Sequence, residues 1–313
     1  MEDVSIVGIC DLDPARARYQ NLEAMLDDLR PDFLDITTRP ELHLEMVEAA
    51  AKRGIPVICQ KPLAPTGDDA VRIVETAERA GIPFMVHENW RWQPWYRVVK
   101  AELEKGLIGE PVTYTFRTRK FDGYGPDAFP AQPYFRDYPR LLLYETLVHH
   151  LDTARFMFGE VHRVYAQGRR VNPLIAGEDQ VLLLTTHASN LGGVIDGHRF
   201  LDLRPDSPPL GDFCVDGIGA SLRVDAAGNV WLWNGREQKS IWQNTVGEGY
   251  RGDSVRATCR HFIDQLRGGR QFETGGREYL KTVACVEAGY RSLASGRAES
   301  TLTFSELPAT GPK

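Results

Sequence analysis

Lys61 stands directly after a short apolar run and directly before a proline. The run PVIC (56–59) is typical of a buried strand in a parallel sheet. Pro62 biases Lys61 toward an extended backbone, which aims its ammonium group beyond the strand end, where open α/β sheets bind ligands. A charge there costs free energy unless it has a partner or a task. We therefore expect Lys61 to be functional, with a solvated surface lysine as the alternative.

The segment ETLVHHLDTARFMFG, which starts at Glu145, is typical of a helix. Glu145, His149 and Asp152 then form one stripe at i, i+4 and i+7. A carboxylate four residues from a histidine can hold its tautomer and raise its basicity, as a proton relay requires. A solvated helix face is the alternative. A metal site is a third reading, but His150 points about 100° away from His149, so one ion would not bind all four side chains.

Asp11 ends the apolar run VSIVGIC (4–10), which we expect to be a strand. An acid at such a strand tip can bond both ribose hydroxyls of NAD and repel the 2′-phosphate of NADP. A helix N-cap is the alternative role, although Asp13, which precedes Pro14, fits a cap better.

The stretch TTRPELH (37–43) leaves a second expected strand and enters a helix. Thr38 and Pro40 would line the crevice beyond the strand ends. His43 lies in the first helical turn, and a hydrogen-bonded packing role is at least as compatible with its position.

The first 87 residues alternate short apolar runs with helical patterns. Two helical patterns, 41–53 and 67–80, end in the similar phrases RGIPVIC and AGIPFMV, where Gly54 and Gly81 suit left-handed helix ends. The pattern predicts two βαβ units and a parallel sheet. The expected strands are 4–10, 33–37, 56–59 and 83–87.

Strands outnumber helices after residue 88. Helical patterns occur at 94–105, 145–158, 252–267 and 277–291, and a strand is expected at 111–118, before a polar, aromatic loop. Seven further strand candidates follow one another through short turns, namely HRVYAQG, DQVLLLTTH, LGGVIDGHR, FCVDGI, ASLRVDA, NVWLWN and QKSIWQN. This pattern predicts a mostly antiparallel sheet that carries a few helices. We expect one domain over 1–87 and a second over 88–313.

Composition excludes several classes of protein. The chain of 313 residues has 37 basic and 43 acidic side chains and a net charge of −6, so it lacks a basic footprint for nucleic acid or an anionic membrane. No apolar run approaches the roughly 18 residues that span a bilayer, and the acidic start is no signal peptide. Five scattered cysteines without a CxxC pair favour reduced thiols in the cytoplasm and make a structural zinc site unexpected.

The phrases CDLDPARA, TTRPELH, QKPLAP, RWQP and ETLVHHLDTARFMFGE together resemble the Gfo/Idh/MocA family of sugar and polyol oxidoreductases. The resemblance covers essentially the whole chain. It implies an α/β fold with an N-terminal Rossmann domain and a C-terminal α+β domain, built on an open-faced, mostly antiparallel sheet that carries the substrate pocket. It also implies a homodimer or homotetramer.

The resemblance assigns roles to individual residues. It implies that Lys61 binds and polarises the reacting hydroxyl, that His149 is the general base and that Glu145 orients it. Asp152 would bind substrate or support the base, and Arg91 would lie near the nicotinamide. Further positions match the cofactor side of the family, namely Asp11, Thr38, Pro40, His43 and Gln60.

Three phrases combine aromatic and charged side chains that suit polyhydroxylated ligands. They are FDGYG with Asp122, PYFR with Tyr134 and Arg136, and DGHR with Asp196 and His198. Together with VHENWRWQPWYR, they are similar to apiose-dehydrogenase-like members of the family. A structural role competes with substrate binding at each position.

The sequence departs from the family pattern in three ways. No GxGxxG occurs in residues 1–87, so we expect the first βα unit of the Rossmann domain to be missing, and the stretch after DPARAR is short. Gln60 replaces the usual glutamate, although an amide can still bond a ribose hydroxyl. Glu145 replaces the usual aspartate and adds one methylene of reach.

The first expectation for function is a dehydrogenase that transfers hydride between a sugar or polyol hydroxyl and NAD, with NADP less favoured. The alternative, from the absent glycine-rich turn, is a truncated or non-catalytic homologue that binds a sugar or a partner without dinucleotide. A metal-dependent sugar isomerase that uses the carboxylate–histidine helix is the third reading.

Overall fold

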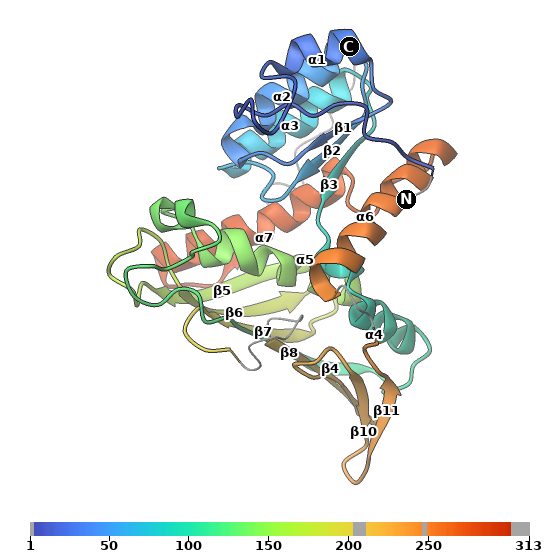
Figure 1. Cartoon of the computed structure of the whole chain (residues 1–313). Helices are drawn as coiled ribbons and strands as arrows, with labels where there is room; N and C mark the ends of the chain where they lie inside the picture. Colours follow the sequence, from blue (N-terminus) through green and yellow to red (C-terminus); the bar gives the residue numbers. More distant parts are fainter. Residues whose placement is uncertain (1–2, 203–210, 246–248, 302–313) are drawn as a thin grey trace. The chain divides into compact units, whose positions relative to one another are not determined.

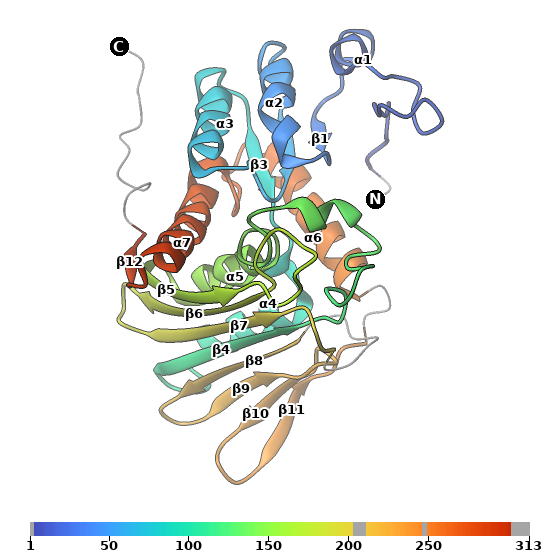
Figure 2. The same cartoon turned by 90° about the vertical axis from the view of Figure 1, so that its left-hand side faces the viewer.

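The computed structural model describes residues 3–202, 211–245 and 249–301. The chain divides into two compact units, shown in Figures 1 and 2. The first comprises Met1–Glu88 and Thr258–Leu280, and the second comprises Asn89–Ala257 and Lys281–Lys313.

The first unit contains a three-stranded parallel sheet in the order β1-β2-β3. Two βαβ units build it, as predicted, and Gly54 and Gly81 have φ values of +68° and +67° just beyond the helices. Thr66 caps α3 (Gly67–Arg79), because its side chain accepts a hydrogen bond from the backbone N–H of Asp69 at 3.1 Å. The elements are α1 (Leu22–Leu29), β1 (Leu34–Ile36), η1 (Pro40–Leu42), α2 (His43–Ala51), β2 (Val57–Gln60), α3 (Gly67–Arg79) and β3 (Phe84–His87).

The expected strand over 4–10 is wrong. These residues pair with no named strand, and their only ladder contact among the described residues is an isolated bridge between Cys10 and Tyr19. Ile6 is 82% exposed and Val7 is 58% exposed, so most of this apolar run lacks the paired neighbour and the covered face that a stable strand needs. No helix begins at Pro14 either, and α1, which the sequence did not predict, begins after the cap Asn21.

Two long helices contribute to both units, α6 (Gly249–Gly268) and α7 (Gly276–Ser295). Phe262 and Ile263 of α6 pack against Ile58 and Met85 of the parallel sheet. The Thr274 hydroxyl donates to the backbone carbonyl of Val86 at 2.7 Å. The segment Thr258–Leu280 therefore lies in the first unit, whereas the expected division at residue 87 placed it in the second, because its apolar contacts are distant in sequence.

The second unit is built on a nine-stranded sheet in the order β11-β10-β9-β8-β4-β7-β6-β5-β12. Only β4 and β7 pair in parallel, so the sheet is mostly antiparallel, as predicted. The strands are β4 (Pro111–Arg119), β5 (Val161–Arg169), β6 (Gln180–His187), β7 (Gly192–His198), β8 (Gly211–Gly217), β9 (Ser221–Val224), β10 (Val230–Trp233), β11 (Gln238–Trp242) and β12 (Glu299–Ser300).

Helices cover one face of this sheet. Figure 2 shows α5 and the second half of α7 on that face, while none of the described helices lies on the other. Alternate residues of β6, such as Leu183 and His187, are buried toward the helices. The other elements are η2 (Trp90–Trp92), α4 (Pro94–Glu104), η3 (Pro133–Asp137), η4 (Leu142–Leu147) and α5 (Val148–Phe158). Over the described ranges, no helix is both long and apolar enough to cross a bilayer.

The packing of α6 against the parallel sheet generates a test of the first unit. Phe262 is 1% exposed and its ring lies 5.2 Å from the rings of both Phe33 and Phe272. We expect Phe262→Ala to lower the free energy of unfolding by about 3–5 kcal/mol, because it leaves a cavity beneath the sheet. Urea unfolding measures the loss, and hydrogen exchange should show weaker protection of β2 and β3.

The matched control is Phe121→Ala, because Phe121 is 55% exposed. We expect it to change stability by less than about 0.5 kcal/mol. Equal losses in the two variants would contradict the placement of Phe262 in the core of the first unit.

Candidate active site

Polar groups gather at the carboxyl edge of the parallel sheet in the first unit. Thr38 follows β1, Gln60 ends β2 and Lys61 follows it, so all three lie at the same edge. Lys61 is half-buried, and its backbone N–H donates to Oε1 of Gln60 at 2.9 Å. This edge is where open α/β sheets bind ligands, so the predicted positions of Lys61 and Gln60 hold.

His43 is fully buried. Its Nδ1 lies 2.9 Å from the Leu63 carbonyl oxygen and its Nε2 lies 3.1 Å from the Thr38 carbonyl oxygen. Burial lowers the pKa of this imidazole, which favours its neutral form. The contacts match the packing alternative: His43 holds the Thr38 loop to the loop after Lys61. Pro40, which begins η1 three residues before His43, is also buried.

Asp11 lies in a turn rather than at a strand tip. Its Oδ1 accepts a hydrogen bond from the Asp13 backbone N–H at 2.9 Å, and its own N–H donates to the Tyr19 carbonyl at 3.0 Å. The turn therefore occupies one oxygen of the carboxylate that we expected to bind ribose.

The expected helix over 145–158 is two elements. Glu145 lies in η4, a π-helical segment, whereas His149 lies in the first turn of α5. A π turn closes hydrogen bonds at i→i+5 and is often found at functional sites, and it changes the angle between the two side chains from that of a regular α-helix.

His149 is 8% exposed and stacks on Trp90. The ring centroids are 4.9 Å apart and the planes differ by 22°. Trp90 opens the motif WRW in η2, and no local pattern predicts its contact with the helix at residue 149. An imidazole held flat against an indole keeps one orientation, as a positioned general base requires.

His150 contacts the sheet, although its ring centroid also lies 5.8 Å from that of Trp90. Its Nε2 lies 2.7 Å from the hydroxyl of Thr118, and its ring packs edge-on to Phe116 at 5.2 Å. The two adjacent histidines thus serve different surroundings, as helix geometry predicted. Over the described ranges, no group of three His, Cys, Asp or Glu side chains could hold a metal ion.

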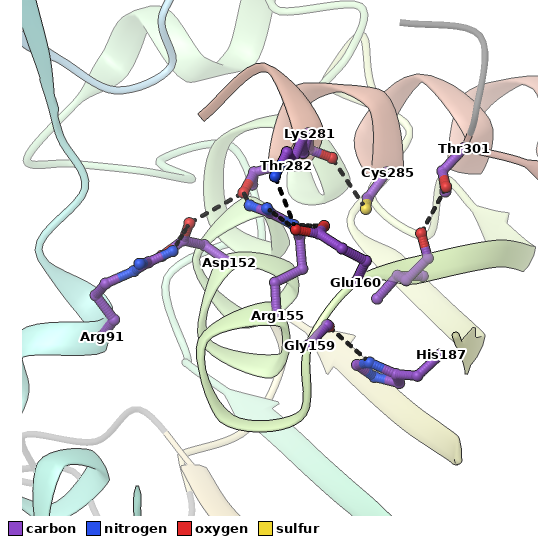
Figure 3. Close-up of polar contacts among 11 residues, drawn as sticks. Arg91, Asp152, Arg155, Gly159, Glu160, His187, Lys281, Thr282, Cys285 and Thr301 are labelled. Atoms are coloured by element: carbon purple, nitrogen blue, oxygen red, sulfur yellow. Dashed lines mark hydrogen bonds and ion pairs between the residues drawn. The ribbon is translucent and has the colours of Figure 1, made fainter. Parts of the chain in front are cut away.

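Asp152 is fully buried in a network of ionic and hydroxyl groups, shown in Figure 3. Arg91 donates to both of its oxygens at 2.7 Å, and the Thr282 hydroxyl donates to Oδ1 at 3.0 Å. The carboxylate expected to bind substrate and the guanidinium expected near nicotinamide are therefore paired with each other. Thr282 was missed because no local signal connects α7 to residue 152.

The network continues from Thr282 to a second ion pair. Arg155 donates to the Thr282 hydroxyl at 2.7 Å and to both oxygens of Glu160, and Lys281 lies 3.1 Å from Glu160 (Figure 3). Burial alone raises the pKa of Glu160, but Arg155 and Lys281 outweigh it and hold that pKa below its usual value.

The residues expected to line a sugar pocket in the loop after β4 have contacts within their own unit. Asp122 receives two hydrogen bonds from Arg199, at 2.6 Å and 2.7 Å. The Tyr134 hydroxyl accepts from the side chain of Gln132 at 3.0 Å. Arg136 donates to the Ala128 carbonyl at 2.9 Å, so it shapes the loop.

Two segments of the chain, which together span most of its first 207 residues, match a known family. Residues 3–88 match the oxidoreductase family with an NAD-binding Rossmann fold that is named Gfo/Idh/MocA, and residues 96–207 match the Gfo/Idh/MocA C-terminal domain.

Individual relatives agree with this match. The chain is 36% identical to a D-apiose dehydrogenase of Rhizobium rhizogenes, over 95% of this chain and 90% of that protein. It is also 36% identical to a D-apiose dehydrogenase of Paraburkholderia graminis, over 100% of this chain and 86% of that protein. An Agrobacterium radiobacter oxidoreductase, solved in complex with NAD+, L-tartaric acid and magnesium, is 35% identical with a TM-score of 0.85, covering 94% of this chain and 90% of that one.

The fold and these matches define an oxidoreductase with an NAD-binding Rossmann domain, related to sugar dehydrogenases. The chain belongs to the Gfo/Idh/MocA family.

The pairing of Arg91 with Asp152 gives a stability prediction. The two side chains are 6% and 0% exposed, so Arg91→Met leaves a buried carboxylate without its main partner. We expect the free energy of unfolding to fall by about 3–5 kcal/mol. The double variant with Asp152→Leu should lose less than the single one, because no unpaired charge remains.

Urea unfolding of both single variants and the double variant measures this coupling. Additive losses would show that the two groups do not depend on each other. Arg163→Met, at an exposed position on β5, serves as a matched control and should leave stability almost unchanged.

Proposed function

We propose that this protein is an NAD-dependent dehydrogenase that oxidises a hydroxyl group of a sugar or polyol. The observation that carries the proposal is His149, a nearly buried imidazole stacked on Trp90 in a chain of the Gfo/Idh/MocA family. The relatives named D-apiose dehydrogenase make D-apiose the first substrate to assay.

His149 is assigned the general base, which takes the proton of the reacting hydroxyl. Such catalysis contributes about 10²–10⁴-fold to the rate. Glu145, four residues earlier, is assigned the role of orienting the imidazole and stabilising its charged form once the proton has moved.

Lys61 is assigned the electrophile. Its ammonium group donates a hydrogen bond to the substrate oxygen and stabilises the alkoxide that develops there, an effect of about 3 kcal/mol at comparable sites. The position of Lys61 at the carboxyl edge of the parallel sheet supports this assignment.

Asp152 is assigned a positioning role instead of contact with substrate. Its carboxylate binds Arg91, which lies in the same short helix η2 as Trp90. This ion pair therefore ties η2 to α5 and supports the stack of Trp90 on His149. Asp122 is likewise assigned a positioning role, because its carboxylate binds Arg199. Tyr134 and Arg136 are still proposed to lie beside the substrate, in the loop whose shape their hydrogen bonds hold.

NAD+, when bound, supplies the acceptor for the hydride that leaves the alcohol carbon. The residues proposed to hold it lie in the first unit, at the carboxyl edge of the sheet or in the turns near it. Thr38, Gln60 and Lys61 offer a hydroxyl, an amide and an ammonium group there, which fit ribose and carboxamide oxygens. Asp11 offers its second carboxylate oxygen, Pro40 and His43 shape the loop, and residues 1–87 contain no GxGxxG turn for the diphosphate.

Steady-state kinetics of the full 313-residue chain test the roles of His149 and Lys61. With D-apiose, myo-inositol and other polyols as substrates and NAD+ or NADP+ as acceptor, we expect His149→Ala and Lys61→Met each to lower kcat by about 10²–10⁴-fold. His162→Ala, at an exposed position on β5, is the control and should retain normal turnover. Unchanged turnover in both site variants would refute the assignment.

A second candidate is a homologue that binds a sugar or a partner without dinucleotide. The absence of a GxGxxG from residues 1–87 favours it, because the diphosphate then lacks its usual backbone cradle after the first strand.

Calorimetric titration of this chain with NAD+ separates the two candidates. We expect binding in the micromolar range, which would eliminate the second candidate. Absence of heat up to millimolar NAD+, combined with measurable binding of D-apiose, would eliminate the dehydrogenase instead. Lys61→Met should weaken NAD+ binding in the first case.

A further inference from the structure

A buried chain of hydrogen bonds reaches the carboxylate of Glu145 from the far end of β7. Arg199 follows β7, and its guanidinium donates to the hydroxyl of Thr146 at 2.8 Å. That hydroxyl lies 2.8 Å from Oε2 of Glu145. Arg199 and Thr146 are 6% and 5% exposed, so the contact between them is buried, and the contact of Thr146 with Glu145 is partly buried.

The direction of these hydrogen bonds follows from the groups involved. A guanidinium group only donates, so the Thr146 oxygen must accept from Arg199. The single hydroxyl proton of Thr146 is then directed to Glu145, whose carboxylate accepts it. Arg199 thus causes the Thr146 hydroxyl to donate to Glu145, although Arg199 takes no part in that hydrogen bond.

Thr146 departs from what a helical threonine usually does. Thr153, also buried, donates to the carbonyl oxygen four residues earlier, that of His149, at 2.8 Å. The Thr146 hydroxyl bonds to the side chains of Glu145 and Arg199 instead, and the π-helical segment that contains it has a different hydrogen-bond pattern.

The surroundings of Arg199 fix its position. Asp122 holds the guanidinium through two hydrogen bonds, and Lys120 lies 3.3 Å from Asp122. The backbone N–H of Gly123 donates to the Arg199 carbonyl at 2.9 Å. A Cβ atom at Gly123 would lie 2.6 Å from Cβ of Arg199, so the loop follows the arginine too closely for any other residue.

We propose that Thr146 and Arg199 are positioning residues that fix the carboxylate of Glu145. This inference rests on the proposed function in which Glu145 orients His149. It extends the site beyond the residues that contact substrate. Asp122 fixes the position of the Arg199 guanidinium, Arg199 fixes the orientation of the Thr146 hydroxyl, and that hydroxyl fixes the Glu145 carboxylate.

Thr146→Val tests the inference, because valine keeps the shape of threonine and removes the hydroxyl. We expect kcat to fall about tenfold or more with little change in KM, because the base is misdirected while substrate contacts persist. Thr146→Ser keeps the hydroxyl and should recover most of the lost turnover. Thr185→Val, which removes a buried hydroxyl bonded to Tyr114, is the matched control and should keep normal kcat.

A spectroscopic measurement without substrate or NAD+ gives a second readout. The protein has eight histidines, so the ring nitrogens of His149 can be assigned in histidine-labelled protein by comparison with His149→Ala. We expect Thr146→Val and Arg199→Lys to shift the His149 nitrogen resonances, since the tautomer depends on the orienting carboxylate, and Thr146→Ser to leave them in place. Lysine at 199 keeps the charge and loses the planar fork.

The outcomes separate this inference from the proposed function. Unshifted His149 resonances and normal kcat in Thr146→Val, together with an inactive His149→Ala, would overturn the positioning role of Thr146 and Arg199. The assignment of His149 as the general base would still stand. Shifted resonances in Thr146→Val, together with an active His149→Ala, would support the positioning role of Thr146 and Arg199 but refute the catalytic role of His149. Equal shifts in Thr185→Val would reduce the effect to a general loosening of the unit and would overturn the inference.

Discussion

The ion pair between Arg91 and Asp152 is the contact around which the polar interior of the second unit is arranged. A fully buried carboxylate costs several kcal/mol unless its partners replace water, and here Arg91 and Thr282 do so. These partners come from η2, α5 and α7. One charge that must be neutralised therefore holds three elements in a single arrangement, and the stack of Trp90 on His149 depends on that arrangement.

The contrast between His149 and His150 follows from the same arrangement. The two imidazoles are adjacent in the chain and both lie near Trp90, but His149 stacks on the indole, whereas His150 is tilted to it and also contacts a threonine hydroxyl and a phenylalanine of the sheet. Helix geometry turns them about 100° apart, and packing then gives each a separate task. An imidazole fixed on one face and nearly removed from water is suited to proton transfer, because its orientation needs no reorganisation at the moment of reaction.

The parallel sheet of the first unit presents a simpler constraint. Its strands are short and buried, and all of them end at one edge, so the strand directions alone bring together the polar residues that follow them. Lys61 and Gln60 could be placed from sequence for this reason. The adjacent run at 4–10 looks equally strand-like, but it is exposed, since a strand requires a neighbouring strand as well as a pattern.

The sequence by itself determined both βαβ units, the mostly antiparallel sheet and the positions of Lys61 and His149, because local periodicity, turn residues and family motifs carry that information. Only the tertiary structure decided what the polar side chains contact. It paired Asp152 with Arg91, buried His43 between two carbonyls, broke the expected helix at Leu147 and brought Arg199 to Thr146. These contacts join residues far apart in the chain or depend on the exact packing of side chains, and neither leaves a periodic trace in the sequence.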